Sequence, residues 1–296
     1  MTRGRRPEMT DGLRADAVRR PNDSNEISVD SRVPGLAQMW LVILLNLGIS
    51  VSLMVVLTVA LKIADLPTSP VTIAWGEAIA SLVAVSITLL IGKRWATRPW
   101  SEIFPFAGFS PALLPPLTLA AIGFTAVVSA ISDAVQSLVP IPKWIEPLTK
   151  LYESAPGAAA ISTVLIAPVV EEFLFRGYVL SGLIKRYAPL SAVALSALGF
   201  AVAHMNPWQF VPTYLMGLML GWVRLRSGSL LPCLWLHLAF NGFVTGAFFL
   251  GLPGFGDKEH VHWALSAAGL GLTAFGLHWA RRVLVPSLLR TSLRQR

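Results

Sequence analysis

A series of apolar runs, each about as long as a bilayer is thick, limits the folds open to this chain more than any other feature. A helix needs about 20 mostly apolar residues to cross a hydrocarbon core of about 30 Å, and inside lipid only helices and closed barrels satisfy every backbone polar group. The sequence therefore predicts an all-α, polytopic membrane protein with about eight transmembrane helices. The runs lie at about residues 38–61, 71–92, 113–138, 157–184, 188–206, 209–226, 229–251 and 261–283.

Composition agrees with lipid as the solvent for most of the chain. Only 14% of the residues are charged, against roughly 25% in soluble domains. The net charge of +8 could indicate nucleic-acid binding, but the cations are spread over the connections between the apolar runs. We therefore expect the lipid bilayer as a partner and no nucleic acid.

The distribution of Lys and Arg predicts the orientation. When the connections are numbered alternately, the set that includes both termini carries nineteen of these residues and the opposite set carries four. Cytoplasmic connections carry an excess of Lys and Arg, so we expect both termini in the cytoplasm. The four cations of the opposite set are Lys62, Lys143, Lys150 and Lys258.

The same pattern divides the chain into three parts. Residues 1–36 are polar and contain seven arginines, which predicts a disordered basic cytoplasmic tail. Residues 37–285 form the transmembrane domain, and residues 286–296 form a short basic C-terminal tail. The compactness of the sequence favours a multi-pass protein of a bacterial plasma membrane.

Ionisable residues inside the predicted spans are candidates for function, because a charge at mid-bilayer costs at least about 2.5–3.5 kcal/mol. In the fourth run Glu172 and Arg176 are four residues apart on one helical face, where they can pair and nearly cancel. Glu171 lies about 100° around the helix from Glu172. It can therefore face a cavity without a partner, as a general base would.

Two other runs contribute polar side chains. His204 ends the fifth run, and His237 and Asn241 lie four residues apart on one face of the seventh, where they can present a pair of hydrogen-bond donors. Counted at about 1.5 Å per residue, the depths of these three side chains and of Glu171 spread over about 12 Å. Tilted helices can absorb this spread, so the sequence is compatible with one shared site.

Three short motifs in these runs resemble the signatures of the membrane-embedded CAAX-processing and bacteriocin-processing (CPBP, ABI) proteases, whose eukaryotic members are the type II prenyl-protein endopeptidases. The signatures are two adjacent Glu followed by x-x-x-Arg, then Phe-x-x-x-His, then His-x-x-x-Asn, and all occur in that order. The resemblance covers roughly residues 157–245. The matching residues are Glu171, Glu172 and Arg176, then Phe200 and His204, then His237 and Asn241.

The resemblance implies an intramembrane endopeptidase that acts on a hydrophobic, membrane-associated or lipidated peptide. Glu171 would be the general base that activates a water molecule with the help of His204. His237 and Asn241 would stabilise the oxyanion that forms on the scissile carbonyl. The Glu–Arg pair would hold the site in shape.

A metal is one of two chemical options. Glu171, His204 and His237 could bind zinc in the two-histidine, one-carboxylate pattern of catalytic sites. They could equally activate water directly, and the resembling family has been described in both ways. The pairing of His237 with Asn241 as donors favours the metal-independent glutamate mechanism.

Two other classes of function use the same cluster. A multi-span transporter or channel could relay a proton or ion through Glu, His and Asn side chains. A non-catalytic immunity or regulatory protein could keep the fold and bind a peptide. No His-Glu-x-x-His and no Gly-x-Ser-Gly motif is present, so the patterns of the site-2 zinc proteases and the rhomboid proteases are excluded.

Overall fold

The computed structural model describes residues 33–96, 98–142, 150, 153–252 and 263–294, with side chains described as far as residue 284. The basic tail predicted for residues 1–36 lies almost entirely outside these ranges. Within them the chain is helical and contains no strand. This confirms the all-α prediction.

Each of the eight predicted apolar runs forms a helix or a row of connected helical segments. The fourth run is a row of five segments, and a one-turn helix, α3, lies between the second and third runs. The bounds are α1 Leu36–Ile63, α2 Pro70–Gly92, α3 Trp100–Ile103, η1 Pro111–Leu113, α4 Leu114–Leu138, α6 Pro156–Ile161, η3 Ser162–Ile166, α7 Ala167–Glu171, η4 Glu172–Val179, α8 Leu180–Leu183, α9 Pro189–Ala203, α10 Pro207–Ser227, α11 Leu231–Phe249 and α12 Trp263–Arg294.

Five stretches are long and apolar enough to cross a membrane, which makes this a multi-span membrane protein. Of the remaining helices, α9 has 15 residues, or about 22 Å of rise, which is short for a hydrocarbon core. Helix α10 carries Arg224 and Arg226 in its last turn, and α12 continues well past the apolar run, to Arg294. The count of eight spans stays a prediction. The five are Leu36–Ile63, Pro70–Gly92, Pro111–Leu138, Pro156–Leu183 and Leu231–Phe249.

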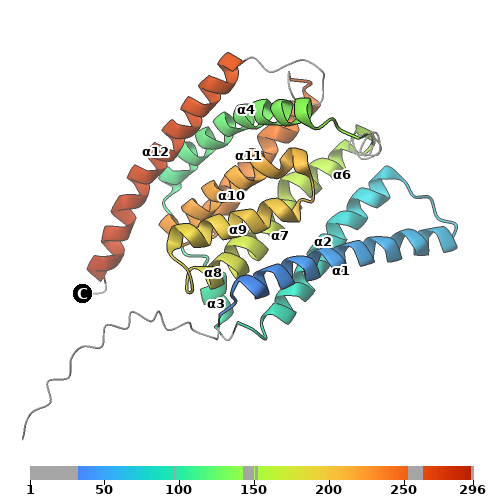
Figure 1. Cartoon of the computed structure of the whole chain (residues 1–296), viewed down its shortest axis with the longest axis horizontal. Coiled ribbons are helices and arrows are strands. Elements are labelled where there is room, and N and C mark those ends of the chain that lie inside the picture. Colours follow the sequence, from blue (N-terminus) through green and yellow to red (C-terminus); the bar gives the residue numbers. More distant parts are fainter. Residues whose placement is uncertain (1–32, 97, 143–149, 151–152, 253–262, 295–296) are drawn as a thin grey trace, which may run out of the picture.

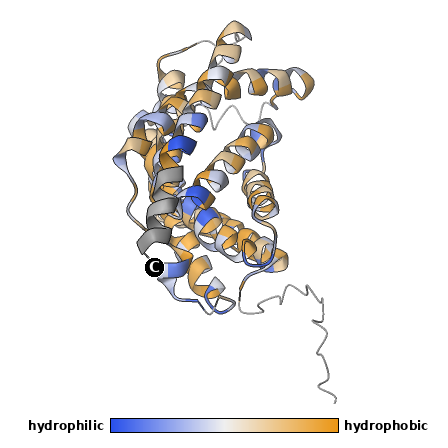
Figure 2. Cartoon of the chain, turned by 90° about the vertical axis from the view of Figure 1, so that its left-hand side faces the viewer, coloured by the Kyte–Doolittle hydropathy of each residue, from blue (hydrophilic) through white to orange (hydrophobic). Residues whose placement is uncertain are grey.

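The helices form a bundle with a polar interior site and an apolar exterior. Figure 1 shows α4 and α12 side by side at one edge, α1 and α2 at the opposite edge, and the fourth run with α9, α10 and α11 between them. Figure 2 shows hydrophobic residues over most of the helices. Large apolar side chains such as Leu44, Val56, Leu270 and Phe275 are exposed, as expected for helices that face lipid.

Contacts between distant connections bring the cation-rich segments to one end of the bundle. The Nε and Nη2 atoms of Arg186, after the fourth run, donate to the carbonyl of Val33 at 2.9 and 2.6 Å. The Oγ of Ser229, before α11, donates to the carbonyl of Ala107 at 2.7 Å. Because successive spans cross the membrane in opposite directions, every second connection must lie at the same end of the bundle, as these contacts show. Which side of the membrane it faces stays a prediction.

Helices α4 and α12 approach each other through glycines. A Cβ atom on Gly269 would lie 2.6 Å from the carbonyl oxygen of Gly123, and one on Gly123 would lie 2.4 Å from the carbonyl oxygen of Gly269. Small residues let two membrane helices pack backbone to backbone, where dispersion replaces the missing hydrophobic driving force. The contact is therefore intolerant of any side chain.

We expect Gly269→Leu to lower the free energy of unfolding by about 1–3 kcal/mol or more, since overpacking forces the two helices apart. Thermal and denaturant unfolding in detergent measure this. Gly271→Leu is the matched control, because Gly271 lies on the same helix and a Cβ atom there would meet no atom within 4 Å. Equal stability of the two variants would show that α4 and α12 do not pack as described.

Candidate functional site

The fourth run departs twice from α-helical hydrogen bonding, on either side of Glu171. The segments η3 and η4 are π-helical, and they flank the short helix α7. Pro168 lies just after η3, and a proline removes one backbone donor and clashes with the carbonyl four residues earlier. The π-helix is rare and often occurs at functional sites. Apolar periodicity alone does not reveal it.

The predicted pair of Glu172 and Arg176 is present and fully buried. The Nη1 atom of Arg176 donates to Oε1 of Glu172 at 3.0 Å, and their side chains are 1% and 0% exposed. The Nη2 atom of Arg176 also donates to the carbonyl of Gly217 on α10 at 3.3 Å. Its guanidinium carbon lies 4.3 Å from the centre of the Phe200 ring, a cation–π distance. The arginine thus joins the fourth run to α9 and α10.

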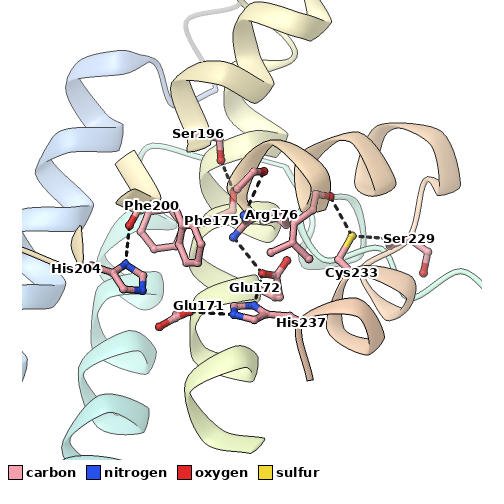
Figure 3. Close-up of polar contacts among 12 residues, drawn as sticks. Glu171, Glu172, Phe175, Arg176, Ser196, Phe200, His204, Ser229, Cys233 and His237 are labelled. Carbon is pink, nitrogen blue, oxygen red and sulfur yellow. Dashed lines mark hydrogen bonds and ion pairs between the residues drawn. The ribbon is translucent and has the colours of Figure 1, made fainter. Parts of the chain in front are cut away.

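His237 of α11 lies between the two adjacent glutamates. Its Nδ1 atom is 2.9 Å from Oε1 of Glu172, and its Nε2 atom is 3.5 Å from Oε2 of Glu171. Figure 3 shows both contacts. A carboxylate accepts only, so Nδ1 donates to Glu172. The second glutamate therefore orients the histidine as well as neutralising Arg176, a role that the sequence did not predict.

His204 caps the C-terminus of α9 and is held by the residue one turn earlier. Its Nδ1 atom lies 2.8 Å from the carbonyl oxygen of Phe200. A carbonyl accepts, so Nδ1 carries a proton, and the electron pair of the neutral form of the ring therefore lies on Nε2. The Phe200 ring meets the rings of His204 and His237 edge-on, at centroid distances of 4.9 and 5.8 Å. The Phe-x-x-x-His spacing thus fixes both the tautomer and the packing.

Asn241 lies one turn beyond His237 on α11 and is half-buried. Its Nδ2 atom donates to the carbonyl of Thr163 in η3 at 2.9 Å. His237 and Asn241 therefore bind different groups of the fourth run in this arrangement. A side-chain amide has two N–H bonds, and the bond to Thr163 uses one of those of Asn241. The second N–H can donate to another group.

Glu171 and His204 line a common cavity of about 230 Å³. The Glu171 side chain is 25% exposed and faces a cavity, as predicted, but the prediction that it has no partner is wrong, because it contacts His237. The opposite wall comes from α1 and α2 and includes Asn46, Ser50 and Ser81. The Oδ1 atom of Asn46 is buried and has no hydrogen-bond partner. The three motifs do not predict this wall, although an amide inside an apolar run, such as Asn46, is itself a candidate functional residue.

A larger apolar groove adjoins this cavity between α1 and α2. Its volume is about 510 Å³, and it shares Leu47, Ser50 and Ser81 with the cavity. The rest of its wall is mostly apolar and includes Met54 and Val55 of α1, with Glu77 of α2 as its one acidic residue. The polar cavity therefore continues into a space suited to a hydrocarbon chain or an apolar side chain.

The three ligands proposed for zinc do not form a metal cluster in the described part of the chain. Among those residues no three His, Cys, Asp or Glu side chains are grouped closely enough to hold a metal ion. Glu171 contacts His237, but His204 shares only the cavity wall with it. Zinc therefore stays one of the two chemical options predicted from the sequence, and no step below depends on it.

Comparison with protein families matches residues 154–243 to the Rce1-like family, described as type II CAAX prenyl endopeptidase Rce1-like. The match confirms the resemblance predicted from the three motifs. It contains all seven residues of those motifs and excludes α1, α2, α4 and α12. Comparison with curated proteins found no match.

Removing one partner of a buried ion pair leaves the other charge uncompensated, at a cost of about 3–5 kcal/mol. We expect this loss of unfolding free energy for Arg176→Met, which leaves the buried carboxylate of Glu172 without its counterion. The double variant Glu172→Gln with Arg176→Met should recover much of the loss, because the remaining group is neutral. Unfolding in detergent compares the three proteins. A single variant as stable as wild type would mean that the pair is not buried as described.

Proposed function

Because residues 154–243 match the Rce1-like family of type II CAAX prenyl endopeptidases, we propose that this chain is an intramembrane endopeptidase that hydrolyses a peptide bond in a membrane-associated or lipidated peptide. The observation that carries the proposal is a carboxylate, Glu171, in a cavity shared with the free Nε2 atom of His204. A carboxylate and an imidazole acceptor on one cavity can orient and deprotonate a water molecule.

The proposed first step is attack by that water. It donates one hydrogen bond to Glu171 and one to Nε2 of His204, which leaves a lone pair on its oxygen directed at the scissile carbonyl carbon. Glu171 takes the proton as the new C–O bond forms. When the C–N bond breaks, the same proton passes from Glu171 to the leaving amine. Glu171 thus acts first as a base and then as an acid.

His237 and Asn241 are proposed to stabilise the oxyanion. The proposal requires His237 with a proton on each ring nitrogen. Nδ1 then donates to Glu172, and Nε2, which lies 3.5 Å from Glu171, donates to the oxyanion. Asn241 contributes the N–H that does not bind Thr163. Such a preorganised donor is worth about 2.7–4 kcal/mol in the transition state.

The apolar groove beside the cavity supports a hydrophobic substrate. Its wall belongs mostly to α1 and α2, outside the family match. A lipid chain or apolar residues placed there would bring the neighbouring peptide bond to the cavity that holds Glu171. The proposal therefore assigns chemistry to residues 154–243 and substrate selection to the first two helices.

We expect Glu171→Gln to lower kcat for cleavage of fluorogenic hydrophobic or lipidated peptides in liposomes by about 10²- to 10⁴-fold, the typical contribution of a general base. Glu153→Gln is the control, since Glu153 is exposed and lies outside the motifs. The same assays run with a chelator decide whether a metal is required. Absence of cleavage by wild type, together with ion flux that depends on Glu171, would overturn the protease proposal in favour of a transporter.

Asn46 is expected to hold the substrate backbone, because its carbonyl oxygen has no partner and the residue lines the same cavity. Asn46→Leu should lower kcat/KM by about 2- to 10-fold, the loss of one neutral hydrogen bond, and leave the melting temperature near that of wild type. Ser52→Leu, an exposed change on the same helix, is the control. Unchanged kcat/KM in the Asn46→Leu enzyme would show that Asn46 does not bind the substrate.

A further inference from the structure

A second arginine, Arg224, is buried in the bundle without an acidic partner. It lies in the last turn of α10 and is 7% exposed, and its Nε atom has no hydrogen-bond partner. Its one described side-chain bond is a long one, 3.5 Å from Nη2 to the hydroxyl of Ser181. No ion pair joins Arg224 to an Asp or Glu among the residues that the structure describes.

A buried guanidinium normally requires a counterion, since removal of its hydration is costly. The C-terminal end of α10 offers only the partial negative charge of the helix dipole. Arg176, the other buried arginine, shows the usual solution, with Glu172 as its counterion. Arg224 has no such counterion, since no described Asp or Glu forms an ion pair with it and the one acidic residue on its cavity wall, Glu102, pairs with Arg98.

A cavity of about 270 Å³ lies beside Arg224. It is at the end of the bundle where the cation-rich connections meet, and it is separate from the cavity of Glu171, with which it shares no residue. Ser181 of the fourth run and Lys185, just after it, contribute to its wall. Arg98 and Glu102 also line it and pair with each other at 2.9 Å. Excluding that pair, two positive charges, those of Arg224 and Lys185, line the cavity.

We propose that this cavity binds a phosphate group. The donors come from different segments, a guanidinium from α10 and an ammonium and a hydroxyl from the end of the fourth run, and together they can surround an anion with several oxygens. The volume lies below the range of about 300–1,000 Å³ typical of small-molecule pockets, which suits an ion or a headgroup. Basic pockets between membrane helices bind lipid headgroups in this way. The inference does not depend on the proteolytic activity.

The test measures the melting temperature of the delipidated full chain in neutral detergent, with inorganic phosphate, phosphatidylglycerol or diacylglycerol of the same acyl chains added separately. A ligand that binds only the folded state raises the melting temperature. We expect stabilisation by a phosphate-containing probe and none by diacylglycerol. Stabilisation by inorganic phosphate assigns the site to a soluble phosphate, and stabilisation by phosphatidylglycerol alone assigns it to a lipid headgroup.

Arg224→Gln should weaken binding of the effective probe by about tenfold or more, the loss of a charge-assisted hydrogen bond. Arg226→Gln removes the same charge two residues away, outside the cavity wall, and should bind like wild type. Lys185→Gln repeats the test if Arg224→Gln does not fold. Wild type that responds to neither phosphate probe, or cavity variants that respond as strongly as Arg226→Gln, would overturn the proposal.

Discussion

The buried contact between Glu172 and Arg176 is the interaction on which the rest of the site depends. Two opposite charges one turn apart are tolerated in an apolar bundle because they nearly cancel. Their further hydrogen bonds hold the neighbouring helices. Arg176 donates to the carbonyl of Gly217 on α10, and Glu172 accepts from His237 on α11. The ring of Phe200 on α9 packs against the same guanidinium. One ion pair thus sets the positions of three helices around the fourth run.

Adjacent glutamates can take different duties because the environment of each is different. Glu172 is sealed in the core and bound by two donors, while Glu171 opens onto a cavity and touches His237 only at 3.5 Å. A carboxylate held by a guanidinium and an imidazole is a poor base, whereas one that borders a cavity can exchange a proton with what enters it. Glu171 ends α7 and Glu172 begins the π-helical segment η4, and both contact the same histidine ring.

The sequence predicted much of the fold because lipid permits few alternatives. Apolar runs of spanning length formed helices, and the four-residue spacing of Glu172 and Arg176 produced the expected pair. The contact of Glu171 with His237 could not be derived, since counting depth assumes straight α-helices and the fourth run contains π-helical turns. The cavity wall that contains Asn46 and the buried position of Arg224 were not predicted, because neither residue has a partner nearby in the sequence.

The two buried arginines also explain how α10 is held in the bundle. This helix is not among the stretches that are apolar enough to span a membrane by themselves, yet it is packed against α9 and α11. Gly217 binds Arg176 in the core, and Arg224 lies about two turns further along the same helix. The first contact ties α10 to the fourth run through an internal counterion, and apolar side chains such as Leu220 and Val223 pack the helix into the core. The second requires the external anion proposed above.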